Sequence, residues 1–384
     1  MNDSTLKPLQ LSIPNLAGNE WNYIKECLDT NWISSVGSYV TLFEQRIAEF
    51  TGVKYAIATS NGTAALHIAL QLANVKKNDY VIVPNITFIA SLNSIKYIDA
   101  NPILIDIDKE TWQIDLELLK VFLETKTYQK NNFCYLIENN RPISAIMPVH
   151  VLGNMCDMTK LMEIADLYNI AVIEDSTEAL GSYHNNKHAG SFGLAGTLSF
   201  NGNKIITTGG GGMILTNDEN LAIKAKHLTT QAKADSKEYY HEEIGYNYRL
   251  VNVLAAIGVA QLELLPQFLV RKKEIDGFYK QNLPQIGDFE FQKVGENVNP
   301  NNWLFTTMTS KQKQCLAICA ENKIEARPFW VPMNQLPMFK DDIYFSLQNI
   351  SQEVYSKCIS LPCSTSVTDS ELERVVSTLN KINN

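Results

Sequence analysis

Short apolar runs rich in β-branched residues alternate with amphipathic stretches through the first half of the chain, and this alternation constrains the fold most. Most of the runs are continuously apolar, which is typical of strands buried on both faces of a mostly parallel sheet. The amphipathic stretches between them predict helices that cross over the sheet, so we expect an α/β layered fold. The predicted strands are Tyr55–Thr59, Tyr80–Pro84, Ile103–Ile107, Ala145–Val149, Ala171–Glu174, Thr197–Phe200 and Gly212–Leu215.

The pattern changes after about residue 247. Val251–Tyr279 predicts a long helix rich in Ala and Leu, with a kink or break at Pro266. Shorter strands and helices follow it. We therefore predict a large α/β domain at 1–250, including an N-terminal arm, and a smaller C-terminal domain at 251–384 that includes the long helix.

Composition excludes several functional classes. Hydrophobic residues make up 45% and charged residues 19% of the 384 residues, as in ordinary globular proteins. The formal net charge is -8, and an acidic surface repels phosphate backbones, so a nucleic-acid partner is not expected. We expect neither a membrane span nor a signal peptide. The seven cysteines are scattered without a CxxC pair, which predicts reduced thiols, no metal site and a cytoplasmic location.

Polar motifs follow several of the predicted strands, where ligands collect in α/β sheets. SNGTAAL at 60–66 opens a helix, and Gly62 with Thr63 as a cap can present free amides to a phosphate. Glu174 and Asp175 end an apolar strand, where a carboxylate needs a hydrogen-bonding or cationic partner. Lys204 follows another strand and precedes four glycines, so its amine could lie in a dry site and become nucleophilic. Each motif alone also fits an ordinary cap or loop.

Together these motifs supply what pyridoxal phosphate needs. The helix start binds the phosphate, one of the two carboxylates at the later strand end pairs with the pyridine nitrogen, and Lys204 forms the Schiff base. Phe88, which follows a further strand, can stack on the ring. A nicotinamide-dependent dehydrogenase is not favoured, because no GxGxxG follows an early strand.

The motifs SNGTAAL, VPNITFIA, VIEDSTEALGS, LSFNGNK and GYNYRLVNVLAAIGVAQLE resemble those of the DegT/DnrJ/StrS sugar aminotransferases. The resemblance implies the fold of type I pyridoxal-phosphate transferases, with a mostly parallel seven-stranded sheet and a small C-terminal α+β domain. It implies a homodimer with shared active sites. It also assigns the catalytic lysine to Lys204 and cofactor binding to Gly62, Thr63, Phe88, Asp175, Glu178, Ser199 and, from the neighbouring subunit, Asn247. Because Glu178 would face the cofactor's phenolic oxygen, we expect it to share a proton with its neighbours.

Further segments, among them residues 14–21, 27–35 and 325–330, resemble enzymes that aminate a UDP-linked 4-keto-6-deoxy-N-acetylhexosamine for legionaminic acid or bacillosamine-type sugars. The implied amino donor is L-glutamate, which leaves as 2-oxoglutarate while the cofactor becomes pyridoxamine phosphate. Amination of a GDP-linked 4-keto sugar, as in perosamine synthesis, and a non-catalytic cofactor-binding relative remain alternatives. Candidate substrate residues are Trp32, Ser34, Ser35, Arg249, Arg327 and Trp330, and His150, His184 and His188 are weaker candidates.

Overall fold

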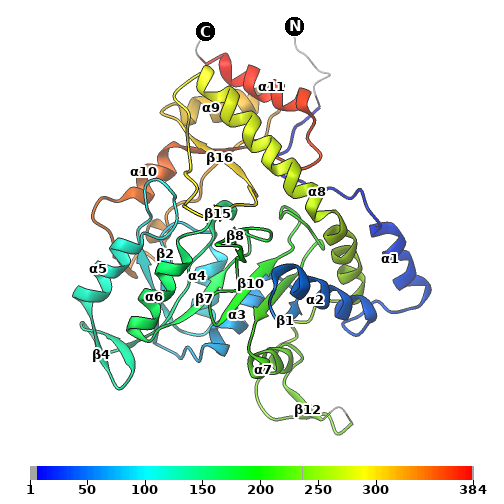
Figure 1. Cartoon of the computed structure of the whole chain (residues 1–384), viewed down its shortest axis with the longest axis vertical. Coiled ribbons are helices and arrows are strands. Elements are labelled where there is room, and N and C mark those ends of the chain that lie inside the picture. Colours follow the sequence, from blue (N-terminus) through cyan, green and yellow to red (C-terminus); the bar gives the residue numbers. More distant parts are fainter. Residues whose placement is uncertain (1–6, 236, 383–384) are drawn as a thin grey trace.

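The central sheet forms the middle layer of the protein, as the computed structural model of residues 7–235 and 237–382 shows (Figure 1). Its main strand order is β1-β11-β10-β7-β6-β2-β3-β18, and β5 with β4 extends it beside β6. The strands from β10 to β18 run parallel, whereas β11 is antiparallel to both of its neighbours. The strands are β1 (Tyr55–Thr59), β2 (Tyr80–Pro84), β3 (Asn101–Ile105), β4 (Thr127–Lys130), β5 (Phe133–Leu136), β6 (Pro142–Ile146), β7 (Ala171–Asp175), β10 (Ala195–Ser199), β11 (Gly212–Thr216) and β18 (Ile343–Phe345).

The predicted α/β class is confirmed, and all seven predicted strands exist, with end points shifted by up to three residues. The prediction of seven strands was too low, because the sheet has ten in the described residues. Two of the additional strands form the β4–β5 hairpin, and the third, β18, comes from the C-terminal part of the chain. These segments are short or partly exposed, so they lack the continuous apolar run on which the prediction relied.

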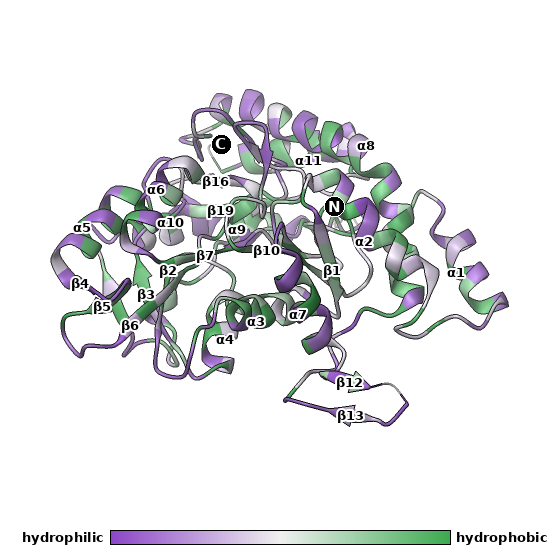
Figure 2. Cartoon of the chain, turned by 60° about the horizontal axis from the view of Figure 1, so that its bottom comes forward, coloured by the Kyte–Doolittle hydropathy of each residue, from purple (hydrophilic) through white to green (hydrophobic). Residues whose placement is uncertain are grey.

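Helices cover both faces of the sheet and account for its apolar strands (Figure 2). In β2, Ile82 packs in a cluster with residues of α5 and α6, while Val81 and Val83 pack in a cluster with residues of α3 and α4. Successive side chains of a strand point to opposite faces, so both faces must be apolar. The helices of this part are α1 (Glu20–Asp29), α2 (Ser38–Thr51), α3 (Gly62–Leu72), α4 (Ala90–Tyr97), α5 (Leu116–Lys126), α6 (Met158–Tyr168) and α7 (Glu219–Thr229).

The long helix α8 (Asn252–Asn282) continues through Pro266, so the predicted break is absent, whereas the predicted kink stays a prediction. Its apolar residues pack against α2 and the sheet in one core cluster. By length and composition, Asn252–Gln285 could cross a membrane, which the sequence analysis did not foresee. Half of its most apolar window is buried within the fold, as expected for a core helix. The buried Gln261 and Tyr279 bond to groups of the same fold.

The C-terminal part forms a second, smaller sheet in the order β14-β16-β19-β17, covered by α8, α9 and α11. The chain crosses between the two parts more than once: backbone bonds tie Leu9 to residues 323 and 325, while β18 joins the large sheet. The division at residue 250 remains a prediction. The elements are β14 (Glu290–Phe291), β16 (Phe305–Met308), β17 (Arg327–Pro328), β19 (Cys358–Leu361), α9 (Gln312–Glu321), α10 (Ile350–Lys357) and α11 (Asp369–Asn380), with a further hairpin of β12 (Lys233–Asp235) and β13 (Tyr240–His241) and a small sheet of β8 (Tyr183–His184), β9 (Lys187–His188) and β15 (Val298–Asn299).

Candidate active site

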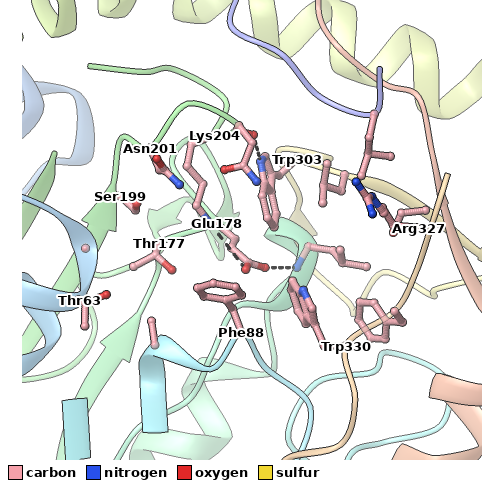
Figure 3. A pocket seen from close by; sticks show the side chains of 18 of the residues that line it. Thr63, Phe88, Thr177, Glu178, Ser199, Asn201, Lys204, Trp303, Arg327 and Trp330 are labelled. Atoms are coloured by element: carbon pink, nitrogen blue, oxygen red, sulfur yellow. Dashed lines mark hydrogen bonds and ion pairs between the residues drawn. The ribbon is translucent and has the colours of Figure 1, made fainter. Parts of the chain in front are cut away.

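A cavity of about 600 Å³ lies between the carboxyl ends of the sheet strands and the small C-terminal sheet (Figure 3). The large sheet contributes Lys204, Glu178 and Phe88 from the segments after β10, β7 and β2, and the start of α3 contributes Gly62 and Thr63. The C-terminal part contributes Trp303, Arg327 and Trp330. The cavity therefore joins motifs that lie far apart in the sequence.

The start of α3 forms a cradle for an anion. Asn61 is the N-cap, because its Oδ1 accepts a hydrogen bond of 2.8 Å from the N–H of Ala64, so the predicted capping role of Thr63 was wrong. The N–H groups of Gly62 and Thr63 come first in the helix and have no intrahelical partner. A Cβ at position 62 would lie 2.9 Å from the Cβ of Ser199. Only glycine leaves this space open beside the helix start.

Two adjacent acids at the end of β7 have different environments. The carboxylate of Glu174 is fully buried and accepts hydrogen bonds from the backbone of residues 190, 192 and 193, as well as contacting His150 at 3.1 Å. Asp175 is 2% exposed and accepts hydrogen bonds from the hydroxyls of Ser91 at 2.6 Å and Thr177 at 2.7 Å. Glu174 thus stabilises the fold, while Asp175 presents a fixed carboxylate on the other face of the strand.

Lys204 and Glu178 face each other in the cavity, with 3.7 Å between Nζ and Oε1 (Figure 3). Desolvation by burial lowers the pKa of Lys204, against the opposing pull of Glu178 and Asp175. Burial also raises the pKa of Glu178 to about 7, although the nearby ammonium and the N–H of Leu152 favour its ionised form. Both shifts favour a proton shared between the amine and the carboxyl, which supports the expected sharing by Glu178.

Leu152 supports this carboxyl. Its N–H donates a hydrogen bond of 2.9 Å to Oε2 of Glu178. Its φ of 62° lies in the left-handed region, which is strained for leucine and occurs where the surroundings fix the backbone. No sequence pattern indicates this role, because an apolar Leu–Gly dipeptide does not show which carboxyl its backbone will contact.

The residues of this site fit pyridoxal phosphate. The open cradle at Gly62 suits a phosphate, and Lys204 is a desolvated amine whose pKa the carboxylate of Asp175 raises. Phe88 is 54% exposed and lines the cavity, so its ring is available for stacking. The individual roles of these residues and of Ser199 remain proposals.

Several other predicted site residues lie away from the cavity of their own chain. Asn247 is exposed in the segment that follows β13 and bridges to Thr230. The side chain of Arg249 is 7% exposed and donates hydrogen bonds to Glu44 at 2.8 Å and to the carbonyl of Ala58 at 3.0 Å, so its guanidinium is not free to bind a pyrophosphate of the same site. This placement corrects the predicted substrate role of Arg249 within one chain.

The N-terminal candidates also lie outside the cavity lining. Trp32 is 55% exposed, and its carbonyl, like that of Ser34, accepts a hydrogen bond from Asn252 at the start of α8; Ser35 follows in the same loop. Arg327 and Trp330 do line the cavity. The histidine candidates were wrong, because His150, His184 and His188 are at most 3% exposed within the core.

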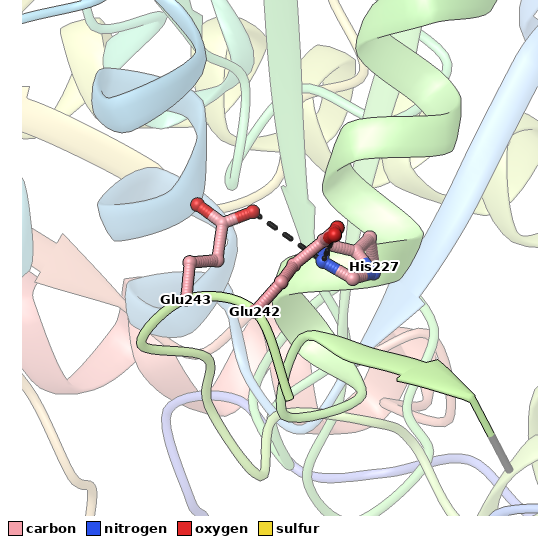
Figure 4. Close-up of side chains that lie close together, drawn as sticks. All are labelled: His227, Glu242 and Glu243. Carbon is pink, nitrogen blue, oxygen red and sulfur yellow. Dashed lines mark ion pairs between the residues drawn. The ribbon is translucent and has the colours of Figure 1, made fainter. Parts of the chain in front are cut away.

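A second cluster of ionisable groups lies at the hairpin beyond α7 (Figure 4). The Nε2 atom of His227 is 3.2 Å from Glu242 and 3.3 Å from Glu243. Lys224 also forms an ion pair with Glu243, so an ammonium already balances part of this charge. We assign no metal to this cluster.

Comparisons with known proteins agree with this geometry. Residues 14–380 match the DegT/DnrJ/EryC1/StrS aminotransferase family. The chain is 38% identical over 379 residues to the GDP-perosamine synthase of Escherichia coli O157:H7, covering 98% of this chain and 99% of the relative. It is 37% identical over 392 residues to that of Caulobacter vibrioides, covering 99% of each.

Solved structures show the same fold. Helicobacter pylori PseC, an aminotransferase involved in the biosynthesis of pseudoaminic acid, superposes with a TM-score of 0.87 at 24% identity and covers 98% of this chain and 99% of that one. A family member from Brucella abortus gives a TM-score of 0.87 at 22% identity, with 95% of each chain covered. The chain belongs to the DegT/DnrJ/EryC1/StrS family and is a pyridoxal-phosphate-dependent sugar aminotransferase.

Proposed function

We propose that this aminotransferase moves an amino group from L-glutamate to C4 of a GDP-linked 4-keto-6-deoxy sugar. The similarity to GDP-perosamine synthases over nearly the whole chain is the observation that carries this proposal. It favours the alternative of the sequence analysis over the UDP-linked N-acetylhexosamine of legionaminic acid or bacillosamine-type synthesis. The UDP-linked substrate rests on short motifs alone.

The shape of the cavity supports a nucleotide sugar. It extends from Lys204 to the small C-terminal sheet, where Phe329 and Trp330 stack with 4.8 Å between ring centroids. Arg327 lies beside them, and its side chain is 65% exposed. A stacked aromatic pair and an exposed guanidinium offer contacts for a base and a pyrophosphate. The same cavity must also admit the smaller dicarboxylate donor.

When bound, pyridoxal phosphate supplies a carbonyl that carries the amino group and a ring that withdraws electrons. The N–H groups of Gly62 and Thr63 bind its phosphate at the start of α3. Asp175 holds a proton on the ring nitrogen, and its bonds to Ser91 and Thr177 fix the carboxylate.

The amine of Lys204 moves the proton. Its Nζ would take a proton from the α-carbon of glutamate and pass it to the carbonyl-derived carbon of the cofactor in the first half of the reaction, and would carry a proton from that carbon to C4 of the sugar in the second half. Glu178, 3.7 Å from this amine, would exchange a proton with it between transfers, so that the amine can return to its free-base form. Burial lowers the pKa of Lys204 and raises that of Glu178, which brings the proton affinities of the two groups closer together.

We also propose a homodimer in which Asn247 serves the cavity of the partner chain. Asn247 is absent from the lining of its own cavity. The segment that carries it places Tyr246 and Tyr248 in a stacked pair with 5.0 Å between centroids, next to the half-exposed Tyr97 near α3. The exposed Tyr97 and the partly buried tyrosine pair form a partly exposed aromatic surface, which suits contact with a second copy.

The substrate is tested by supplying glutamate and the cofactor with a GDP-linked or a UDP-linked 4-keto sugar and identifying products by mass spectrometry. The proposal predicts amination of the GDP-linked sugar and none by Lys204→Ala. Amination of the UDP-linked sugar alone would overturn the nucleotide assignment. A yellow protein whose colour does not respond to glutamate would instead indicate the non-catalytic relative.

Sedimentation equilibrium tests the proposed homodimer. A monomer at micromolar protein concentration would contradict it.

A further inference from the structure

Trp303, which the sequence analysis did not select, contacts the catalytic lysine from the C-terminal part of the chain (Figure 3). The Nζ of Lys204 lies 3.9 Å from the centroid of the indole ring. The indole N–H donates a hydrogen bond of 2.7 Å to the carbonyl of Asn203, the residue before the lysine. Trp303 is 3% exposed. A single buried side chain therefore contacts both the amine and the backbone that carries it.

Buried polar groups fix Trp303 in this position. The Nζ of Lys272, in α8, donates hydrogen bonds to the carbonyls of Trp303 at 2.7 Å and Cys363 at 2.5 Å. The backbone N–H of Trp303 donates to Oδ1 of Asn301 at 2.9 Å, and the amide of Asn301 donates to the carbonyl of Glu178 at 2.8 Å. This network joins the backbones that carry the indole and the carboxyl facing Lys204.

Lys272 is an unusual residue for a helix core. It is 3% exposed, and desolvation lowers its pKa. Burying an amine costs free energy unless hydrogen bonds compensate, and apolar residues fill such positions more easily. Its two carbonyl acceptors tie α8 to the strand ends that carry Trp303 and Cys363. These contacts indicate that the position of this backbone matters.

We propose that Trp303 is a positioning residue for Lys204, and that Lys272 holds Trp303 in place through its backbone carbonyl. The inference rests on the proposed function, because it concerns the amine that performs the transfer. The indole ring covers one side of the amine, while Glu178 and Asp175 supply the negative charges that act on it. The ring face favours the ammonium form, and the bond to Asn203 limits movement of the loop.

The test measures the lysine without cofactor or substrate, so it is independent of whether the proposed substrate is correct. Trace acetic anhydride labels lysines in the cofactor-free protein across a pH series, and mass spectrometry of the peptide with Lys204 gives the labelling midpoint. In Trp303→Phe we expect a midpoint a few tenths of a pH unit lower, because a phenyl ring attracts a cation less strongly than indole does. In Trp303→Leu, water reaches the amine, so labelling is faster and the midpoint rises.

Trp330→Phe is the matched control, because Trp330 lines the same cavity but has no contact with Lys204 among the described interactions. It should leave the midpoint unchanged. Thermal unfolding of every variant shows whether the fold persists. Wild-type midpoints in both folded Trp303 variants, or an equal shift in Trp330→Phe, would overturn the positioning role.

Lys272→Met separates anchoring from packing. It keeps the volume of the side chain but removes the donor to the Trp303 carbonyl. We expect a lower unfolding temperature together with a smaller shift of the Lys204 midpoint in the same direction as in Trp303→Phe. A lower unfolding temperature with a wild-type midpoint would overturn the anchoring role of Lys272.

Discussion

Replacing Glu178 with Gln should change how the stability of the cofactor-free protein depends on pH. Burial raises the pKa of Glu178 from its usual 4.5 to about 7 in the folded protein. Between these values the folded chain binds more protons than the unfolded chain, so the free energy of unfolding falls as the pH rises. The slope approaches about 1.4 kcal/mol per pH unit, which gives a loss of about 3 kcal/mol across the window. Below pH 4 the contribution is fully present.

Glutamine has nearly the same shape and can still accept the hydrogen bond from the N–H of Leu152, but it does not titrate. The stability of Glu178→Gln relative to the wild type should therefore rise by about 2 to 3 kcal/mol between pH 5 and pH 8. Losing the carboxylate also lowers the pKa of Lys204 further, since Glu178 raises it in the native protein. That change acts in the same direction, because the unfolded chain then binds more protons than the folded chain.

Urea unfolding followed by circular dichroism at several pH values measures this difference. Glu373→Gln, at an exposed position of α11, is the matched control and should follow the wild type at every pH. A constant difference between Glu178→Gln and the wild type from pH 5 to pH 8 would refute the claim that Glu178 takes up the proton. With substrates present, the pH–rate profile of Glu178→Gln should also lack the limb near pH 7 that titration of Glu178 gives the wild type.

Two further changes test the cofactor site. Gly62→Ala places a Cβ 2.9 Å from the Cβ of Ser199, and such overpacking costs about 1 to 3 kcal/mol of folding stability, so the apoprotein should unfold at a lower temperature and, because the Cβ narrows the cradle, cofactor titration should show weaker binding than in the wild type. In Gly202→Ala the added Cβ has no atom within 4 Å, so this control variant should bind the cofactor as the wild type does. Equal cofactor affinity in Gly62→Ala and Gly202→Ala would contradict the cradle. Asp175→Asn keeps an acceptor for Ser91 but lacks the charge, so we expect the cofactor to bind while turnover falls by about 100-fold or more. Unchanged turnover would exclude its role at the ring nitrogen.

Local sequence patterns predicted most of the large sheet, because most of its strands are continuous apolar runs. A continuous apolar run such as Val81–Val83 places side chains in two core clusters, which requires a sheet that is covered on both faces. The position of Asp175 followed from the same pattern, since a polar residue directly after such a run lies at the sheet edge. The pattern did not indicate which of the two adjacent acids, Glu174 or Asp175, would face the site. Glu174 and Asp175 point to opposite faces, and only the fold places His150 beside the first and Ser91 beside the second.

The remaining contacts depend on chain segments that no local pattern connects. Trp303 meets Asn203 across 100 positions of sequence, and Lys272 meets Cys363 across 91. A lysine inside a long helix predicts an exposed charge, because most lysines are solvated. The observed burial depends on two carbonyls from distant strand ends. Such sites become visible only when the tertiary structure brings the donors and acceptors together.

For a related reason, the nucleotide of the proposed substrate is hard to predict from the sequence. The chemistry at Lys204 requires an amine and carboxylates in fixed positions, and the residues that provide them lie in short motifs at strand ends. The far end of the cavity is built from Arg327 and Trp330 on short segments beside β17, where the side chain of Arg327 is held mainly by the neighbouring Glu325. An exposed arginine and an aromatic pair can bind a pyrophosphate and a base of either kind. Under the proposed function, amino-group transfer is therefore specified by residues that the fold holds in fixed positions, whereas the choice between GDP and UDP would depend on a more exposed surface.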